Sequence, residues 1–137
     1  MTEFYLLGAG RPHIGDGHTA LRKISNSSQV IDWLLHAVNF LDPKCFFVCG
    51  YQADAIKDLH PNLNYIENKE WEVTKSGWSL LTSLSEKSQN TLVSYSDIVF
   101  RESVVKKMLE TDGDIVVTVD SQWRSRYLGR AFEDINK

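Results

Sequence analysis

The chain has 137 residues, of which 42% are hydrophobic and 24% are charged, so it is long enough to bury one core. Its formal net charge of −3 argues against a surface that binds nucleic acid or a membrane. No apolar run approaches the roughly 18 residues of a membrane span, and the N-terminus lacks the basic start of a signal peptide. We therefore expect a single globular domain located in the cytoplasm.

Short apolar segments and longer amphipathic segments alternate along the chain. Nearly all-apolar runs predict five strands, at residues 4–8, 44–50, 63–68, 91–100 and 114–120. Apolar residues spaced three and four apart predict helices at residues 27–41, 52–60, 76–87 and 102–111, with Ser27 or Ser28 capping the first. Apolar strands that alternate with helices indicate a mainly parallel sheet covered on both faces, which is a three-layer α/β/α fold.

The first predicted strand opens into a long loop that contains glycine, LLGAGRPHIGDGHTALRKI at residues 6–24. Gly-Ala-Gly at 8–10 lets the backbone approach a ligand, and its N–H groups can form an anion-binding concavity. Arg11, Arg22 and Lys23 add positive charge for phosphates. Because the third glycine of GxGxxG and the GK[ST] of a P-loop are both missing, ordinary turn chemistry stays open as the alternative.

Polar residues also follow later strands, at the edge of the sheet where such folds bind ligands. Asn68 follows the third predicted strand, and Asp97 follows the apolar core of the fourth. A carboxylate at this edge is suited to hold Mg²⁺ together with substrate phosphates, and the alternative for Asp97 is a cap on the next turn. Asp120 repeats the argument at the end of the fifth predicted strand, with a capping role as the leading alternative.

The order of these segments resembles the N-terminal part of the sugar-nucleotidyltransferase superfamily. Within it, the chain is most similar to the choline-phosphate and phosphonate cytidylyltransferases and to the nucleotidyltransferase domains fused to phosphoenolpyruvate mutases. The similarity runs from Phe4 to about Tyr127 and is most specific in Gly50-Tyr51, in NKEWEVTKSGWSL at 68–80 and in YSDIVF at 95–100. It implies transfer of a nucleoside monophosphate from a nucleoside triphosphate, with CTP favoured, to a phosphorylated or phosphonylated small molecule, with Mg²⁺ as cofactor and pyrophosphate as product.

The resemblance also implies a set of site residues. The predicted catalytic residues are Arg11, Lys23 and Asp97. The predicted nucleotide-binding residues are Leu7, Gly8, Ala9, Gly10, Arg11, Tyr51, Asn68, Thr74 and Ser79. The predicted metal ligands are Asp97 and Asp120.

The chain departs from the family pattern in the loop. Pro12, Ile14 and Thr19 stand where the family has the second Gly, the Arg and the Lys, so Arg11, Arg22 or Lys23 would have to replace those phosphate contacts. The family also continues well beyond the point where this sequence stops. We therefore expect residues 1–137 to be one domain that forms the N-terminal portion of a longer one, and to dimerise or pack on a further domain because a sheet edge is left uncovered. The alternative function is a catalytically inactive nucleotide-binding or assembly domain.

The remaining reactive and aromatic side chains give no further site. Cys45 and Cys49 have neither zinc-knuckle nor CxxC spacing and are predicted to be buried thiols. The histidines are predicted to be ordinary surface or helix-end residues, because no pair has zinc-ligand spacing: His13, His18, His36 and His60. Three tryptophans are predicted to lie in the core or at its edge: Trp33, Trp71 and Trp78. The segment 123–130, WRSRYLGR, is predicted to be a solvated tail, with contact to an acceptor phosphate as the alternative.

Overall fold

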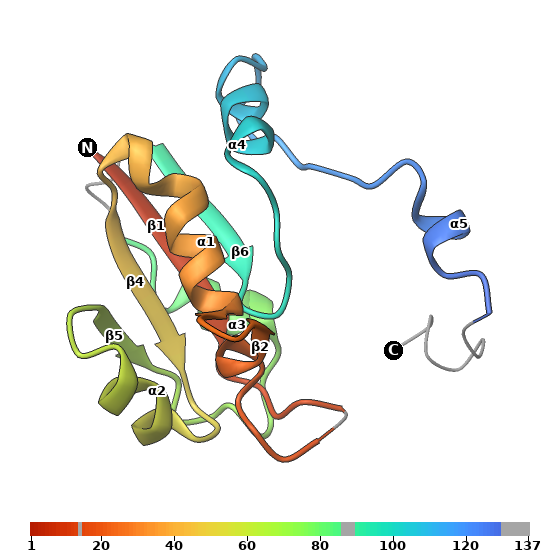
Figure 1. The fold of residues 1–137 in the computed structure, drawn as a ribbon. Helices are drawn as coiled ribbons and strands as arrows, with labels where there is room; N and C mark the ends of the chain where they lie inside the picture. Colours follow the sequence, from red (N-terminus) through yellow and green to blue (C-terminus); the bar gives the residue numbers. More distant parts are fainter. Residues whose placement is uncertain (14, 86–89, 130–137) are drawn as a thin grey trace. The chain divides into compact units, whose positions relative to one another are not determined.

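The computed structural model describes residues 1–13, 15–85 and 90–129. In this part of the chain, four parallel strands form a sheet in the order β5-β4-β1-β6 (Figure 1). The strands are β1 (Thr2–Gly8), β4 (Lys44–Cys49), β5 (Asn64–Glu67) and β6 (Asn90–Tyr95). The predicted α/β fold with a mainly parallel sheet is confirmed, and the first four predicted strands are all present.

The core is centred on β1, which has a neighbouring strand on each side. Phe4, Tyr5 and Leu6 are all fully buried there, because consecutive side chains of a central strand point into both covered faces. Phe47 of β4 and Ile31 from the first helix are buried against the same sheet. An apolar run of this kind is what the sequence shows at residues 4–7.

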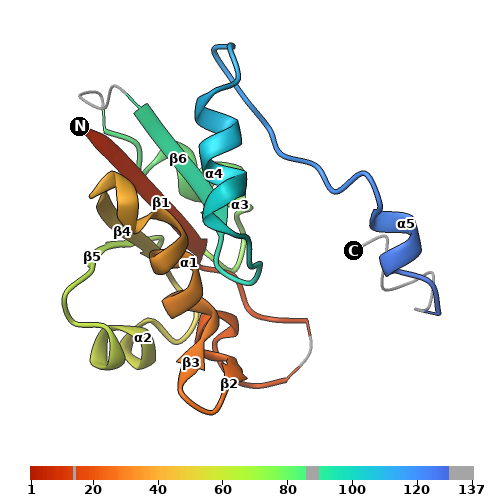
Figure 2. The same ribbon diagram turned by 45° about the horizontal axis from the view of Figure 1, so that its top comes forward.

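Three helices cover the sheet: α1 (Val30–Val38), α2 (Ala53–Leu59) and α3 (Ser76–Leu81). The helices α1 and α2 lie on one face, and α3 lies on the other (Figures 1 and 2). The chain moves outward from β1 to β4 to β5 and then returns past β1 to β6. Because crossovers between parallel strands are right-handed, this reversal places the last crossover on the opposite face.

The first helix begins later than the sequence predicts. A short antiparallel hairpin of β2 (Lys23–Ser25) and β3 (Ser28–Gln29) occupies the residues expected to start the helix, so Ser27 and Ser28 do not cap it. Gln29 takes the N-cap position instead, and its backbone N–H donates to the Asp32 carboxylate at 2.8 Å. An acidic side chain three residues inside the helix satisfies a free N–H as well as a serine cap does.

The chain divides into two compact units, residues 1–102 and 103–137. The helix α4 (Glu102–Leu109) begins at this boundary, and α5 (Trp123–Arg126) lies in the second unit. The predicted strand at 114–120 is wrong. Its alternate apolar side chains Ile115, Val117 and Val119 are 74–86% exposed, and no described strand pairs with it. Strand propensity alone does not form a strand, because the backbone needs a hydrogen-bonded neighbour.

Other predicted boundaries and burials also differ. The third predicted helix, at 76–87, ends at Leu81 in the structure, and Leu81 is exposed. Residues 86–87 of that prediction lie outside the described residues. The fourth predicted strand ends at Tyr95 instead of residue 100. Trp33 and Trp78 are exposed, whereas Trp71 is half-buried as expected. No helix in the described residues is long and apolar enough to cross a membrane.

Candidate functional site

The strand order reverses at β1, and this places a topological switch point between β1 and β6. Open α/β sheets bind ligands in the crevice outside the carboxyl ends of the strands at such a point. Leu7 and Tyr95 are register partners, and Ser96 N–H extends the pairing by donating to Leu7 O at 3.1 Å. Asp97 follows at once and is exposed. The carboxylate predicted to bind metal and the glycine loop therefore leave the sheet at the same edge.

The two glycines of this loop meet different surroundings. A Cβ on Gly8 would contact the Phe47 ring and lie 2.7 Å from Ser96 Oγ, so packing within the sheet requires glycine there. A Cβ on Gly10 would meet no atom of the described residues within 4 Å. Gly10 is exposed, whereas Ala9 is buried and its carbonyl accepts from Tyr51 N–H at 2.8 Å. Of the predicted backbone contacts, Gly10 is thus the one most open to a ligand, while Leu7 is half-buried within the sheet.

His18 returns the loop to the end of β1. It is only 3% exposed, its Nε2 lies 2.9 Å from Gly8 O, and its Nδ1 accepts from Ala20 N–H at 3.2 Å. Its ring packs against Phe47 at a centroid distance of 5.4 Å. The prediction that His18 is an ordinary surface or helix-end residue is therefore wrong about the surface, because the residue is buried, although it does take the N-cap position of the short 3-10 helix η1 (Thr19–Leu21). A carbonyl at the end of a buried strand needs a donor, and here the imidazole supplies it.

Burial has a consequence for the charge of His18. Desolvation lowers the pKa of this imidazole below its usual 6.5, and the hydrogen bond to Gly8 O opposes that effect only in part. Within the described residues the ring contacts a carbonyl, a backbone N–H and an aromatic side chain, none of which carries charge. His18 is thus neutral in this structure at physiological pH. The other histidines fit the prediction better, since His13 and His36 are exposed and His60 is half-buried.

Tyr51 contacts the glycine loop at two places, Arg11 and Asp16. The Arg11 guanidinium carbon lies 5.8 Å from the centre of its ring, and Trp71 packs edge-on at 5.6 Å. Its hydroxyl donates to Asp16 O at 3.1 Å, which ties the far part of the loop to the end of β4. Gln52 Nε2 donates to the same carbonyl at 2.8 Å. Sequence reasoning identified Tyr51 and Arg11 but missed Asp16 and Gln52, which carry no recognisable motif.

Asn68, Thr74 and Ser79 are brought together, as their common assignment to the site requires. The Asn68 amide donates to Thr74 Oγ1 and to Ser79 Oγ, both at 2.9 Å, and its carbonyl oxygen accepts from Glu70 N–H at 2.9 Å. Asn68 is 7% exposed, so this network is largely closed to solvent. In this structure the three side chains bond to one another and hold the segment after β5 in place.

The charged side chains predicted to take part in catalysis or metal binding belong to both units of the chain. Arg11, Lys23 and Asp97 are exposed, and Lys23 lies on the β2–β3 hairpin opposite Gln29. Asp120 belongs to the second unit, where it pairs with Arg126 Nε at 2.7 Å. Within the described residues, no three His, Cys, Asp or Glu side chains form a cluster that could hold a metal by themselves.

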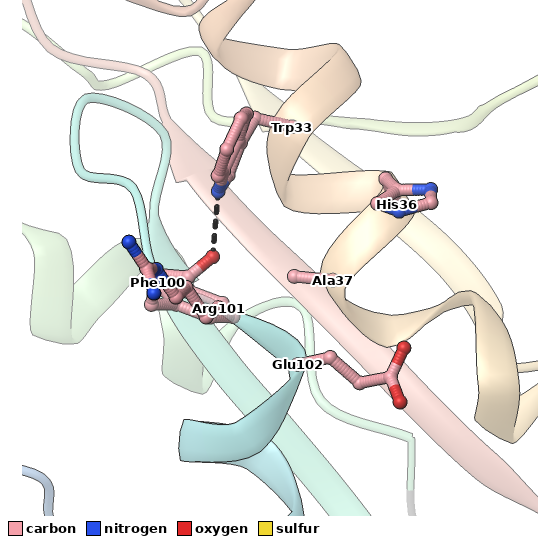
Figure 3. Close-up of a pocket in the computed structure, with 6 residues that line it drawn as sticks. All are labelled: Trp33, His36, Ala37, Phe100, Arg101 and Glu102. Atoms are coloured by element: carbon pink, nitrogen blue, oxygen red, sulfur yellow. Dashed lines mark hydrogen bonds between the residues drawn. The ribbon is translucent and has the colours of Figure 1, made fainter.

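A pocket of about 270 Å³ lies between α1 and the segment after β6 (Figure 3). It is lined by Trp33, His36, Ala37, Phe100, Arg101 and Glu102. The Trp33 indole N–H crosses one side and donates to Phe100 O at 2.7 Å. None of the predicted site residues lines this pocket. The indole bond ties the chain that leaves the switch point to α1, although Trp33 is exposed.

The chain was compared with known protein families, curated proteins and solved structures. No protein family model and no curated protein matches the chain. Among solved structures, it is similar to the CTP:phosphocholine cytidylyltransferase of Streptococcus pneumoniae, with a TM-score of 0.59 and 19% identity. The chain therefore has a nucleotidyltransferase-like fold. The match covers 74% of this chain and 50% of the other, so the chain spans about half the length of that enzyme.

Proposed function

We propose that the edge of the sheet formed by residues 8–11 and Asp97 binds a nucleoside triphosphate, and that the chain acts as a cytidylyltransferase-like nucleotidyltransferase. The reaction would move a nucleoside monophosphate, with CTP favoured as its source, to a phosphorylated or phosphonylated small molecule and would release pyrophosphate. The observation that carries the proposal is that the exposed Gly10 follows β1 and the exposed Asp97 follows β6 at the same edge of the sheet, beside the switch point.

The residues at this edge of the sheet would have two roles, phosphate binding and charge neutralisation. The backbone N–H groups at 9–10 would bind phosphate oxygens, and the exposed Arg11 guanidinium beside the Tyr51 ring would neutralise their charge. Lys23 is the second cation proposed for this role. Positioning and charge neutralisation supply most of the acceleration in transfers of this kind, because little covalent chemistry is required of the protein.

The exposed carboxylate of Asp97 could hold Mg²⁺ only together with oxygen ligands from the substrate. Asp97 supplies one exposed carboxylate, and Mg²⁺ is commonly held by one or two carboxylates together with substrate phosphates and water. When bound, the cation would neutralise charge on the transferring phosphoryl group. We propose Asp97 as its protein ligand. Asp120, which belongs to the second unit, is a second proposed ligand.

A nucleotide-binding or assembly domain without turnover is the second candidate. The observation that favours it is the Asn68 network, in which Asn68, Thr74 and Ser79 direct their polar groups at one another. A side chain already bonded in this way gains less from a ligand, because it must first give up an existing partner. Binding without pyrophosphate release would support this candidate.

Calorimetric titration of the chain with CTP, UTP, GTP and ATP, each with and without Mg²⁺, tests the proposal. We expect one nucleotide to bind at micromolar concentration only with Mg²⁺, and the Asp97→Asn variant to bind it at least tenfold more weakly. The matched control is Asp58→Asn, which removes an exposed carboxylate from α2 and should leave binding unchanged. Pyrophosphate release in the presence of a phosphorylated small alcohol then separates the two candidates.

The same titrations can also contradict the proposal. If none of the four nucleotides binds, or if both aspartate variants weaken binding equally, the edge of the sheet is not a nucleotide site.

A further inference from the structure

The beginning of the glycine loop is held by two hydrogen bonds, one to each of two successive carbonyl groups. His18, whose ring packs on Phe47 of β4, contacts Gly8 O at 2.9 Å. Tyr51, which follows β4, donates its backbone N–H to Ala9 O at 2.8 Å. Leu7 O accepts from Ser96 N–H beyond the end of β6, and carbonyl groups alternate in direction along an extended strand, so Gly8 O faces the β4 side. Ala9 O faces the same side, because its donor Tyr51 follows β4.

The direction of the carbonyl groups determines the direction of the next amides. In a planar trans peptide, C=O and N–H point to opposite sides, and the described chain contains no cis peptide bond. The Ala9 and Gly10 N–H groups must then face away from β4, on the side where β6 and Asp97 lie. Neither N–H donates to a backbone or side-chain group among the described residues. Successive N–H groups that face one side form a concavity suited to an anion.

The hydrogen bonds of the imidazole also define its protonation. Nδ1 accepts from Ala20 N–H, so it must carry a lone pair, and the ring proton must then sit on Nε2, where it is donated to Gly8 O. Only the neutral Nε2–H form satisfies both neighbours. Loss of that form would release the Gly8 carbonyl, and with it the orientation of the Ala9 N–H.

We propose that neutral His18 is a positioning residue that orients the Ala9 and Gly10 amides toward a triphosphate bound at the switch point. This inference rests on the proposed function for its ligand, but the orientation itself is a property of the unliganded chain. His18 would not touch the nucleotide. It acts through Gly8, as Tyr51 acts through Ala9.

Two substitutions separate the two bonds of the ring. In His18→Gln, the amide nitrogen can occupy the place of Nε2 and donate to Gly8 O, whereas in His18→Asn the shorter side chain can only replace Nδ1 as the acceptor for Ala20 N–H. We expect His18→Gln to keep nucleotide affinity within about threefold, and His18→Asn to weaken it about tenfold, as for one lost hydrogen bond. His13→Asn is the matched control, because His13 is exposed in the same loop.

Two measurements test the positioning role of His18 without any nucleotide. Nitrogen chemical shifts of the His18 ring at neutral pH should show the Nε2–H form. Hydrogen exchange at the Tyr51 amide, which donates to Ala9 O at 2.8 Å, should be about tenfold faster in His18→Asn than in the native chain, and near native in His18→Gln. A ring protonated on Nδ1, or equal amide exchange in native chain and both variants, overturns the inference. Failure of the native chain to bind any nucleotide would defeat the proposed function, while the shifts and the exchange still decide the role of His18.

Discussion

The glycine at the end of β1 allows a quantitative test, because the structure provides a matched position two residues away. Replacing Gly8 by alanine puts a methyl group 2.7 Å from Ser96 Oγ and against the Phe47 ring, roughly 0.7 Å closer than an ordinary contact that begins near 3.4 Å. Phe47 has no room to retreat, since it is fully buried with His18 and Tyr65 against its ring. Overpacking of this kind costs about 1–3 kcal/mol of unfolding free energy.

Gly10→Ala is the control. Among the described residues its new methyl group meets no atom within 4 Å, and the φ of Gly10 is not positive, so the substitution should be neutral or stabilise by about 0.4–1 kcal/mol through the unfolded chain. Urea unfolding followed by circular dichroism measures both variants. In thermal unfolding, a cost of about 2 kcal/mol in Gly8→Ala corresponds to a melting temperature lowered by about 7 °C in a chain of this length.

A second substitution identifies the cause. Combining Gly8→Ala with Phe47→Leu removes the ring that the methyl group strikes, so the double variant should lose less stability than the two single variants predict by addition. If Gly8→Ala is as stable as Gly10→Ala within about 0.5 kcal/mol, or if the two costs simply add, the packing argument for Gly8 is refuted.

Three further outcomes follow from other contacts. Asn68→Ala should destabilise the chain by about 2–4 kcal/mol in urea unfolding, because it leaves two hydroxyl groups and one backbone N–H of a buried network without their partner. The stability of the native chain should fall as the pH drops below about 6.5, because burial lowers the pKa of folded His18 and the unfolded state binds the proton more tightly. Unfolding curves of His18→Gln between pH 5 and 7.5 should lack that component, and an unchanged pH slope would contradict it. Trp33→Phe should cost about 0.5–1.5 kcal/mol by removing the donor to Phe100 O, whereas no loss would show that the bond is not formed in solution.

The sequence by itself determined the fold class and the place of the candidate site. Apolar runs at 4–8, 44–50, 63–68 and 91–100 are local signals, and each produced a strand of the parallel sheet close to its predicted position. Given that order of strands and helices, the ends of the strands must meet at one edge. Gly8 and Asp97 could therefore be nominated without knowing any contact between them.

The tertiary structure decided which of these residues are available to a ligand. His18 is buried because Gly8 O needs a donor, and Asn68 is closed off because Thr74 and Ser79 lie within its reach. The alternating apolar residues at 115–119 look like a strand but find no described neighbour to pair with. Periodicity reports how a segment would be buried if a neighbour were present. Whether the neighbour is present, and which polar group it satisfies, depends on residues far apart in the chain and is settled only when they pack.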